Sequence, residues 1–175
     1  MTILNLNISL FTGLLESQAF IGRKRVLSLY LNASQIESVS SQTFNGLTEL
    51  EVLHLEDNLI HSLQGYEFSN LTSLRELYLE GNKLVYIDDL TFSALTSLEV
   101  LHLHDNLLNT YPVWQLKSLL PSLTTLTISG ELFFSIFYFL DFWITVPAPL
   151  KAAVRLVADP FKFQAEKTFY VIYMW

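Results

Sequence analysis

The sequence predicts an α/β-type repeat solenoid, a right-handed arc built from 24-residue repeats. Apolar residues recur at fixed offsets, an asparagine recurs at one place in three successive copies, and a phenylalanine recurs every 24 residues. One repeat cannot bury its apolar side alone, so neighbouring repeats stack into a continuous core. We expect short parallel strands on the concave face and irregular or short helical segments on the convex side.

The clearest copy is Leu50–Leu71, LEVLHLEDNLIHSLQGYEFSNL, which has the leucine-rich repeat pattern L-x-x-L-x-L-x-x-N-x-L. The repeats occupy residues 26–130 and start near residues 26, 50, 74, 98 and 123. Residues 1–25 are predicted to be a degenerate repeat with one extra residue, because Phe20 keeps the 24-residue register while Leu4 is shifted by one.

Alternation predicts the strand of each repeat. Strand side chains point alternately to the two faces, so Leu53 and Leu55 point into the core and His54 points outward. The asparagine after the strand turns inward, where its amide serves backbone groups that no regular ladder satisfies. Ser34 stands at this position in the first repeat and replaces only part of these bonds. The expected asparagine ladder is Asn58, Asn82 and Asn106.

Phenylalanine marks the return half of each repeat. The four positions are 24 residues apart, so stacking brings them into one line. We expect a buried aromatic spine beneath the convex side. Its members are Phe20, Phe44, Phe68 and Phe92.

Composition limits the function classes. The chain has 175 residues, enough for one solenoid domain or a piece of one, and its net charge is −7. Nucleic acid is not an expected partner, because no basic stripe neutralises phosphates. With no cysteine, the chain has no disulfide, thiol nucleophile or cysteine metal site. Neither a glycine-rich phosphate loop nor a G-x-S-x-G elbow occurs, so we expect no enzyme activity and no cofactor.

The outward strand positions give the candidate binding face. Strands in a sheet lie about 4.8 Å apart, so equivalent residues form continuous columns. A metal site is not expected, because two repeats separate His54 from His102 by roughly 10 Å. The columns are a candidate protein-binding surface, and the alternative is a face that is only solvated. Its residues are Tyr30, His54, Glu56, Tyr78, Glu80, His102 and His104.

Three N-x-S/T sequons are candidate glycosylation sites if the chain enters the secretory route: Asn7, Asn32 and Asn70. Asn70 falls on the convex return segment, where a glycan fits. Asn32 falls on the candidate binding face, where a glycan would block part of the surface. The start of the chain is a poor signal peptide, because it has no basic residue before its apolar run.

Residues 131–175 form an apolar tail without the repeat pattern. The run at 132–146 is predicted to be helical or irregular and has two interpretations: a lid over the last repeat, or a weak membrane segment. A spanning helix needs roughly 20 apolar residues, and Asp141 within the run would cost about 2.5–3.5 kcal/mol. Lys151 and Arg155 beyond it would suit a cytoplasmic flank.

The wording of the repeats from about residue 20 to 116 resembles the last ectodomain repeats of insect Toll receptors. The segments that carry this resemblance are FIGRK (20–24), LYLNAS (29–34), TFNGLTELEVLHLEDN (43–58), GYEF (65–68), LRELYLEGN (74–82), LEVLHLHDN (98–106) and PVWQL (112–116).

The resemblance implies a receptor part on the extracellular side of the plasma membrane. It implies binding to a protein ligand or a second receptor chain, in signal transduction during development and innate immunity. Membrane attachment would come through residues 132–146 or through a C-terminal region absent here. The family's cysteine-rich cap is missing. The alternative is therefore an intracellular or membrane-anchored leucine-rich repeat adaptor without receptor signalling.

Overall fold

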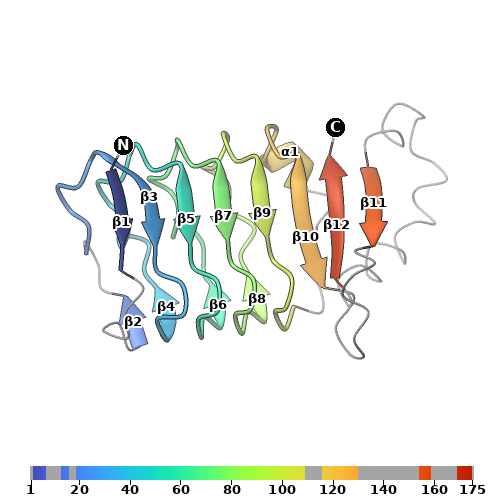
Figure 1. Ribbon diagram of the computed structural model, residues 1–175, viewed down its shortest axis with the longest axis horizontal. Helices are drawn as coiled ribbons and strands as arrows, with labels where there is room; N and C mark the ends of the chain where they lie inside the picture. The colour runs from blue at the N-terminus through green and yellow to red at the C-terminus, as the bar shows by residue number, and fades with distance from the viewer. Residues whose placement is uncertain are drawn as a thin grey trace.

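The computed structural model describes residues 2–6, 13–15, 19–108, 116–129, 154–158 and 169–174. They form one eight-stranded sheet and two sheets of two strands each (Figure 1). The main sheet takes one strand from each repeat, and these strands all run parallel. In spatial order they are β1 (Thr2–Asn5), β3 (Val26–Tyr30), β5 (Val52–His54), β7 (Glu76–Tyr78), β9 (Val100–His102) and β10 (Thr125–Ser129).

The strand register follows the 24-residue period. Leu53 of β5 lies opposite Leu77 of β7, which lies opposite Leu101 of β9. All three leucines have no exposed surface, so the predicted burial of Leu77 and Leu101 is confirmed. Strand β1 joins the same sheet with a register shift between Thr2 and Ile3, and this shift accommodates one extra residue before β3.

The phenylalanine spine lies in the turns of the return segments. Successive rings are stacked at centroid distances of 6.0, 6.0 and 6.2 Å, within 17° of parallel. The predicted contact between Phe68 and Phe92 is confirmed. Because each ring is buried and contacts the next, the spine joins four coils on the side opposite the main sheet.

The return segments are mostly turns, with two short parallel pairs that the sequence did not predict. β2 (Gly13–Leu15) pairs with β4 (Ile36–Val39), and β6 (Ser62–Leu63) pairs with β8 (Tyr86–Ile87). In the part of the chain that the structure describes, α1 (Leu116–Leu119) is the single helix. The convex side is therefore built from turns rather than helices.

A left-handed residue closes the turn after the strand. Ala33, Asp57, Gly81 and Asp105 have φ between 51° and 68°, one at the same place in each repeat. Non-glycine residues are uncommon in this region, and aspartate tolerates it better than most. Gly81 is also packed tightly, since a Cβ there would collide with the Asp57 carboxylate. This turn places the next residue, an asparagine in three repeats, towards the core.

The tail adds two strands that the sequence did not predict. β12 (Phe169–Met174) pairs antiparallel with β10, and β11 (Val154–Ala158) pairs antiparallel with β12 (Figure 1). The edge of the last repeat strand is thus covered by backbone hydrogen bonds of β12, which removes an open template for association. The apolar run at 132–146 lies outside the described residues. Within the described ranges, no helix is long and apolar enough to cross a membrane.

Candidate functional site

Four rings from four adjacent strands form a continuous stack on the outward face of the main sheet. Tyr30, His54, Tyr78 and His102 lie at equivalent positions of β3, β5, β7 and β9. Their centroids are 4.4, 4.3 and 5.0 Å apart, and neighbouring planes are within 15° of parallel. We call this stack the aromatic column. Since the rings cover one another's faces, only their edges are left uncovered, and all four side chains are half-buried.

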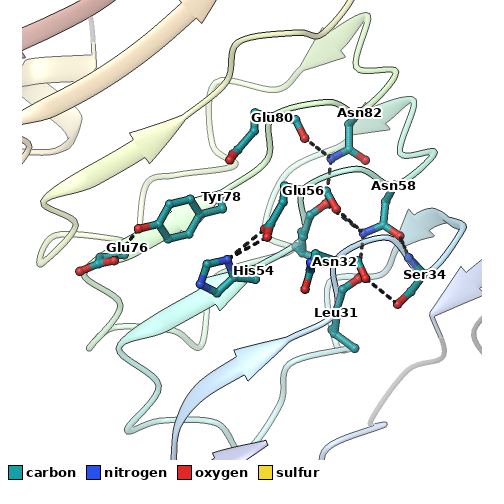
Figure 2. A network of polar contacts seen from close by, with 11 residues as sticks. Leu31, Asn32, Ser34, His54, Glu56, Asn58, Glu76, Tyr78, Glu80 and Asn82 are labelled. Carbon is teal, nitrogen blue, oxygen red and sulfur yellow. Dashed lines mark hydrogen bonds and ion pairs between the residues drawn. The ribbon is translucent and has the colours of Figure 1, made fainter. Parts of the chain in front are cut away.

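Carboxylates flank the aromatic column on both sides. His54 Nδ1 lies 3.0 and 3.1 Å from the two carboxylate oxygens of Glu56, on the same strand segment (Figure 2). The Tyr78 hydroxyl donates to Glu76 Oε2 at 2.7 Å. Burial, and then the bond to Glu76, raises the pKa of Tyr78, so its hydroxyl keeps its proton. The phenol therefore acts as a donor on this face.

Glu80 is the least satisfied carboxylate beside the column. Its side chain is half-buried, and its Oε2 atom has no hydrogen-bond partner among the described residues. Burial raises the pKa of Glu80 to about 7, and the nearby charges of Glu56 and Asp57 act in the same direction. Burial disfavours the charged form of a carboxyl group, which is why this group titrates near neutral pH. Together with Glu56 it forms the acidic column, in which each carboxylate stands two residues after a ring of the aromatic column, Glu56 after His54 and Glu80 after Tyr78.

At the C-terminal end, a threonine joins two histidines. Thr127 Oγ1 lies 3.1 Å from His102 Nδ1 and 2.7 Å from His104 Nδ1. A hydroxyl donates one hydrogen, so both contacts are hydrogen bonds only when at least one imidazole carries a proton on Nδ1. Burial lowers the pKa of His102, against the opposing effect of Glu76 and Glu56. The parallel pairing of β10 with β9 places Thr127 opposite His102, which brings its hydroxyl within reach of both histidines.

The asparagines lie behind this face, within the turns. Asn58 Oδ1 accepts from the backbone N–H groups of Ser34 and Ile36, each at 3.0 Å. Its Nδ2 donates to the carbonyl of Leu31 at 2.9 Å (Figure 2). It also donates to the carbonyl of Leu55 at 3.0 Å. Asn82 and Asn106 repeat this arrangement one and two repeats later. They hold the turns from which the acidic column projects.

The three sequons have different settings. Asn70 is exposed on a return segment, and its side chain donates to Asn45 Oδ1 of the preceding repeat. Asn32 is half-buried, and its Oδ1 is buried without a partner among the described residues. Asn7 lies outside the described residues. Across the described ranges, no group of three or more His, Cys, Asp or Glu side chains is placed to hold a metal ion.

Known proteins are similar to this chain in the region of its repeats. A family model for the leucine-rich repeat matches residues 24–84. The crystal structure of the TLR13–ssRNA13 complex is similar, with 34% identity and a TM-score of 0.58 over 61% of this chain. Over these residues the chain consists of leucine-rich repeats similar to those of a Toll-like receptor. It spans 15% of the length of the TLR13 chain in that structure.

A second solved structure is also similar to this chain. It is the Toll–Spatzle complex, described as a molecular hub in Drosophila development and innate immunity. Identity is 32%, with a TM-score of 0.49, over 55% of this chain and 13% of that chain. No curated protein matches the chain.

The comparison with TLR13 weakens one expectation from composition. Net charge led us to exclude nucleic acid as a partner, yet the TLR13 structure is a complex with ssRNA13. Leucine-rich repeats similar to these thus occur in a protein that forms a complex with ssRNA13. The net charge of the whole chain therefore does not exclude nucleic acid as a ligand. The charge of the binding face is the relevant quantity.

Proposed function

We propose that this chain is a protein-interaction module of a Toll-like receptor ectodomain, and that it binds a protein ligand or a second receptor chain. The observation that carries this proposal is the aromatic column, four stacked rings on the outward face of four successive repeats. Tyrosine is enriched at protein interfaces, and solenoids use such extended faces for binding. Binding, rather than catalysis, is the role that this arrangement supports.

The family relationship supports a more detailed setting. In it the chain lies near the membrane on the extracellular side, within a receptor that transduces signals in innate immunity or development. Asn70 carries a glycan in this setting, because it is exposed and belongs to a sequon. The aromatic and acidic columns face away from that glycan, since Asn70 lies on a return segment.

A paired surface experiment tests the binding face. The full chain is secreted from insect cells and used to retain secreted insect proteins. One variant replaces His54 and Tyr78 with serine, and the matched control replaces Tyr66 and Tyr86, which are 54% and 49% exposed on the return segments. We expect a protein retained by the parent and the control to be lost with the face variant. Equal retention by both variants contradicts the proposal.

The alternative is an adaptor without receptor signalling, and the absence of cysteine in 175 residues favours it. Expression in insect cells separates the two. A mass shift that glycosidase removes, and that Asn70→Gln abolishes, supports the receptor setting. A native product that is cytosolic and unglycosylated contradicts it and supports the adaptor.

A further inference from the structure

We infer that the aromatic and acidic columns bind a cationic α-helix of a protein partner, lying along the columns and across the strands. The helix presents lysine or arginine at i, i+3, i+7 and i+10. This inference rests on the proposed function, because it names the segment that the proposed binding face recognises. The charge of the face, the half-buried carboxyl group of Glu80 and the spacing of the columns lead to this partner.

The charge of the face decides the sign of the ligand. The strand segments 50–58, 74–82 and 98–106 hold one cation, Arg75, which pairs with Glu99 at 3.5 Å. The same segments hold seven carboxylates, so the face attracts cations and repels phosphate. These carboxylates are Glu51, Glu56, Asp57, Glu76, Glu80, Glu99 and Asp105.

Glu80 shows what the isolated face lacks. Its buried Oε2 atom has no donor among the described residues, and an unsatisfied buried acceptor is costly. Because that atom is covered, a partner's lysine or arginine would approach the half-buried carboxyl group from its exposed side rather than bond to Oε2. It would also favour the charged form of Glu80, because an opposite charge close by lowers the pKa of a carboxyl group.

The aromatic column limits how a cation can bind. Centroid distances of 4.3 and 4.4 Å around His54 leave no space between its ring and those of Tyr30 and Tyr78. A cation therefore cannot sit over these ring faces and must pair with the carboxylates beside them. Long side chains pack their aliphatic stems along apolar surface while the charged head reaches a polar group. Lysine and arginine suit ring edges bordered by glutamates in this way.

The spacing of the columns favours a helix over an extended peptide. Rings recur at 4.3–5.0 Å along the column. In an α-helix, residues i and i+3 are about 4.5 Å apart along the axis, and i and i+4 about 6 Å. In an extended strand, residues on one side recur at about 6.6–6.8 Å, which loses register after two repeats. A helix thus places one side chain opposite each repeat.

Peptide binding to the full chain tests the inference. The probe is a soluble amphipathic helix with lysine at i, i+3, i+7 and i+10. The first control peptide has the same composition with its lysines scattered around the helix, and the second has proline within it, so that it cannot be helical. We expect only the first peptide to bind, and its affinity to fall with added salt.

Two charge-matched variants locate the site. Glu56→Gln with Glu80→Gln is expected to weaken peptide binding about tenfold, as two modest charge pairs together amount to roughly 1.4 kcal/mol. Glu37→Gln with Glu49→Gln, at exposed positions outside the columns, should leave the affinity unchanged. Binding is measured well above pH 7, where Glu80 is ionised and both variants remove two charges. Thermal melting of both variants checks that they are folded.

The outcomes separate this inference from the proposed function. Equal binding of the proline peptide overturns the helix, and equal weakening by both charge variants overturns the site. Binding of single-stranded RNA, with no binding of the helical peptide, overturns the cationic partner. If a partner protein is lost with the His54/Tyr78 variant but no cationic helix binds, the inference fails and the proposed function stands.

Discussion

The ring of Phe68 lies 6.2 Å from the ring of Phe92, with the two planes 5° from parallel. On its other side, Phe68 stacks on Phe44 at 6.0 Å. None of these three rings is more than 1% exposed. The contact joins two return segments that share no main-sheet strand, so the spine holds the coils together independently of the main sheet.

Replacing Phe68 with alanine should cost about 3–5 kcal/mol of unfolding free energy, because a buried ring is lost and a cavity remains. In a double-mutant cycle with Phe92→Ala, the coupling should be about 0.5–1.5 kcal/mol. The same cycle with Phe20→Ala, two repeats away, serves as the control and should be additive within about 0.5 kcal/mol. Chemical denaturation measures all four proteins of each cycle. Equal coupling free energies in the two cycles would show that the direct contact between the rings does not contribute to the stability of the fold.

The leucines of the strands give a second stability test. Leu77→Ala or Leu101→Ala should lower the unfolding free energy by about 2–5 kcal/mol, since both side chains are fully buried. Leu107→Ala is the matched control, because Leu107 is 59% exposed, and it should change stability by less than about 0.5 kcal/mol. A similar loss in all three variants would contradict the assigned faces.

The hydrogen bonds of the asparagine ladder predict that replacing Asn58 lowers the unfolding free energy even when the new side chain has the same volume. Asn58→Leu keeps the volume but leaves two backbone N–H groups and two carbonyls without their buried partner. We expect a loss on the order of 3 kcal/mol. Asn58→Ala should cost less, because the smaller side chain leaves room for water to replace some of these bonds. Asn70→Leu, on the exposed return segment, is the control; an equal loss there would rule out the ladder as the cause.

The raised pKa of Glu80 predicts a pH dependence of stability. Its folded pKa of about 7 lies above the unfolded value of 4.5, so the folded state holds this proton more tightly. The stabilisation from Glu80 is complete below pH 4.5 and is lost as the pH rises through 7. Glu80→Gln removes this loss, so the variant should gain stability over the parent between these pH values. Melting temperatures across the range measure the difference; a constant difference would show that Glu80 titrates normally.

Much of the fold follows from the sequence because each repeat carries the same information. The 24-residue spacing of leucine, asparagine and phenylalanine fixes which side chains face the core, and Leu77, Leu101 and Phe68 lie where it predicts. The strands of the tail were missed because their pairing is non-local. VRLVA and FYVIYM carry β-branched and aromatic residues, a signal for strands, but nothing in either segment specifies β10 as the partner.

The columns of the candidate face could be read from the same spacing, but their chemistry could not. Alternation places His54 and Tyr78 on the outward face, whereas the near-parallel contact that covers their rings depends on side-chain rotamers. Two further features depend on distances of a few ångströms. One is the contact of the Thr127 hydroxyl with both His102 and His104, and the other is the lack of a hydrogen-bond partner for Glu80 Oε2. Sequence periodicity specifies a side chain's direction and says nothing of its partner.

The asparagine contacts that cross from one repeat to another all run one way along the chain. Asn58 serves the turn of the repeat before it, and Asn82 and Asn106 do the same for theirs. A turn is therefore completed only by the repeat that follows it. On the ribosome, where the chain emerges from its N-terminus, each turn waits for the next 24 residues before its buried amides are satisfied. We therefore expect folding of the solenoid to lag one repeat behind synthesis, with the turn of the most recently made repeat still incomplete.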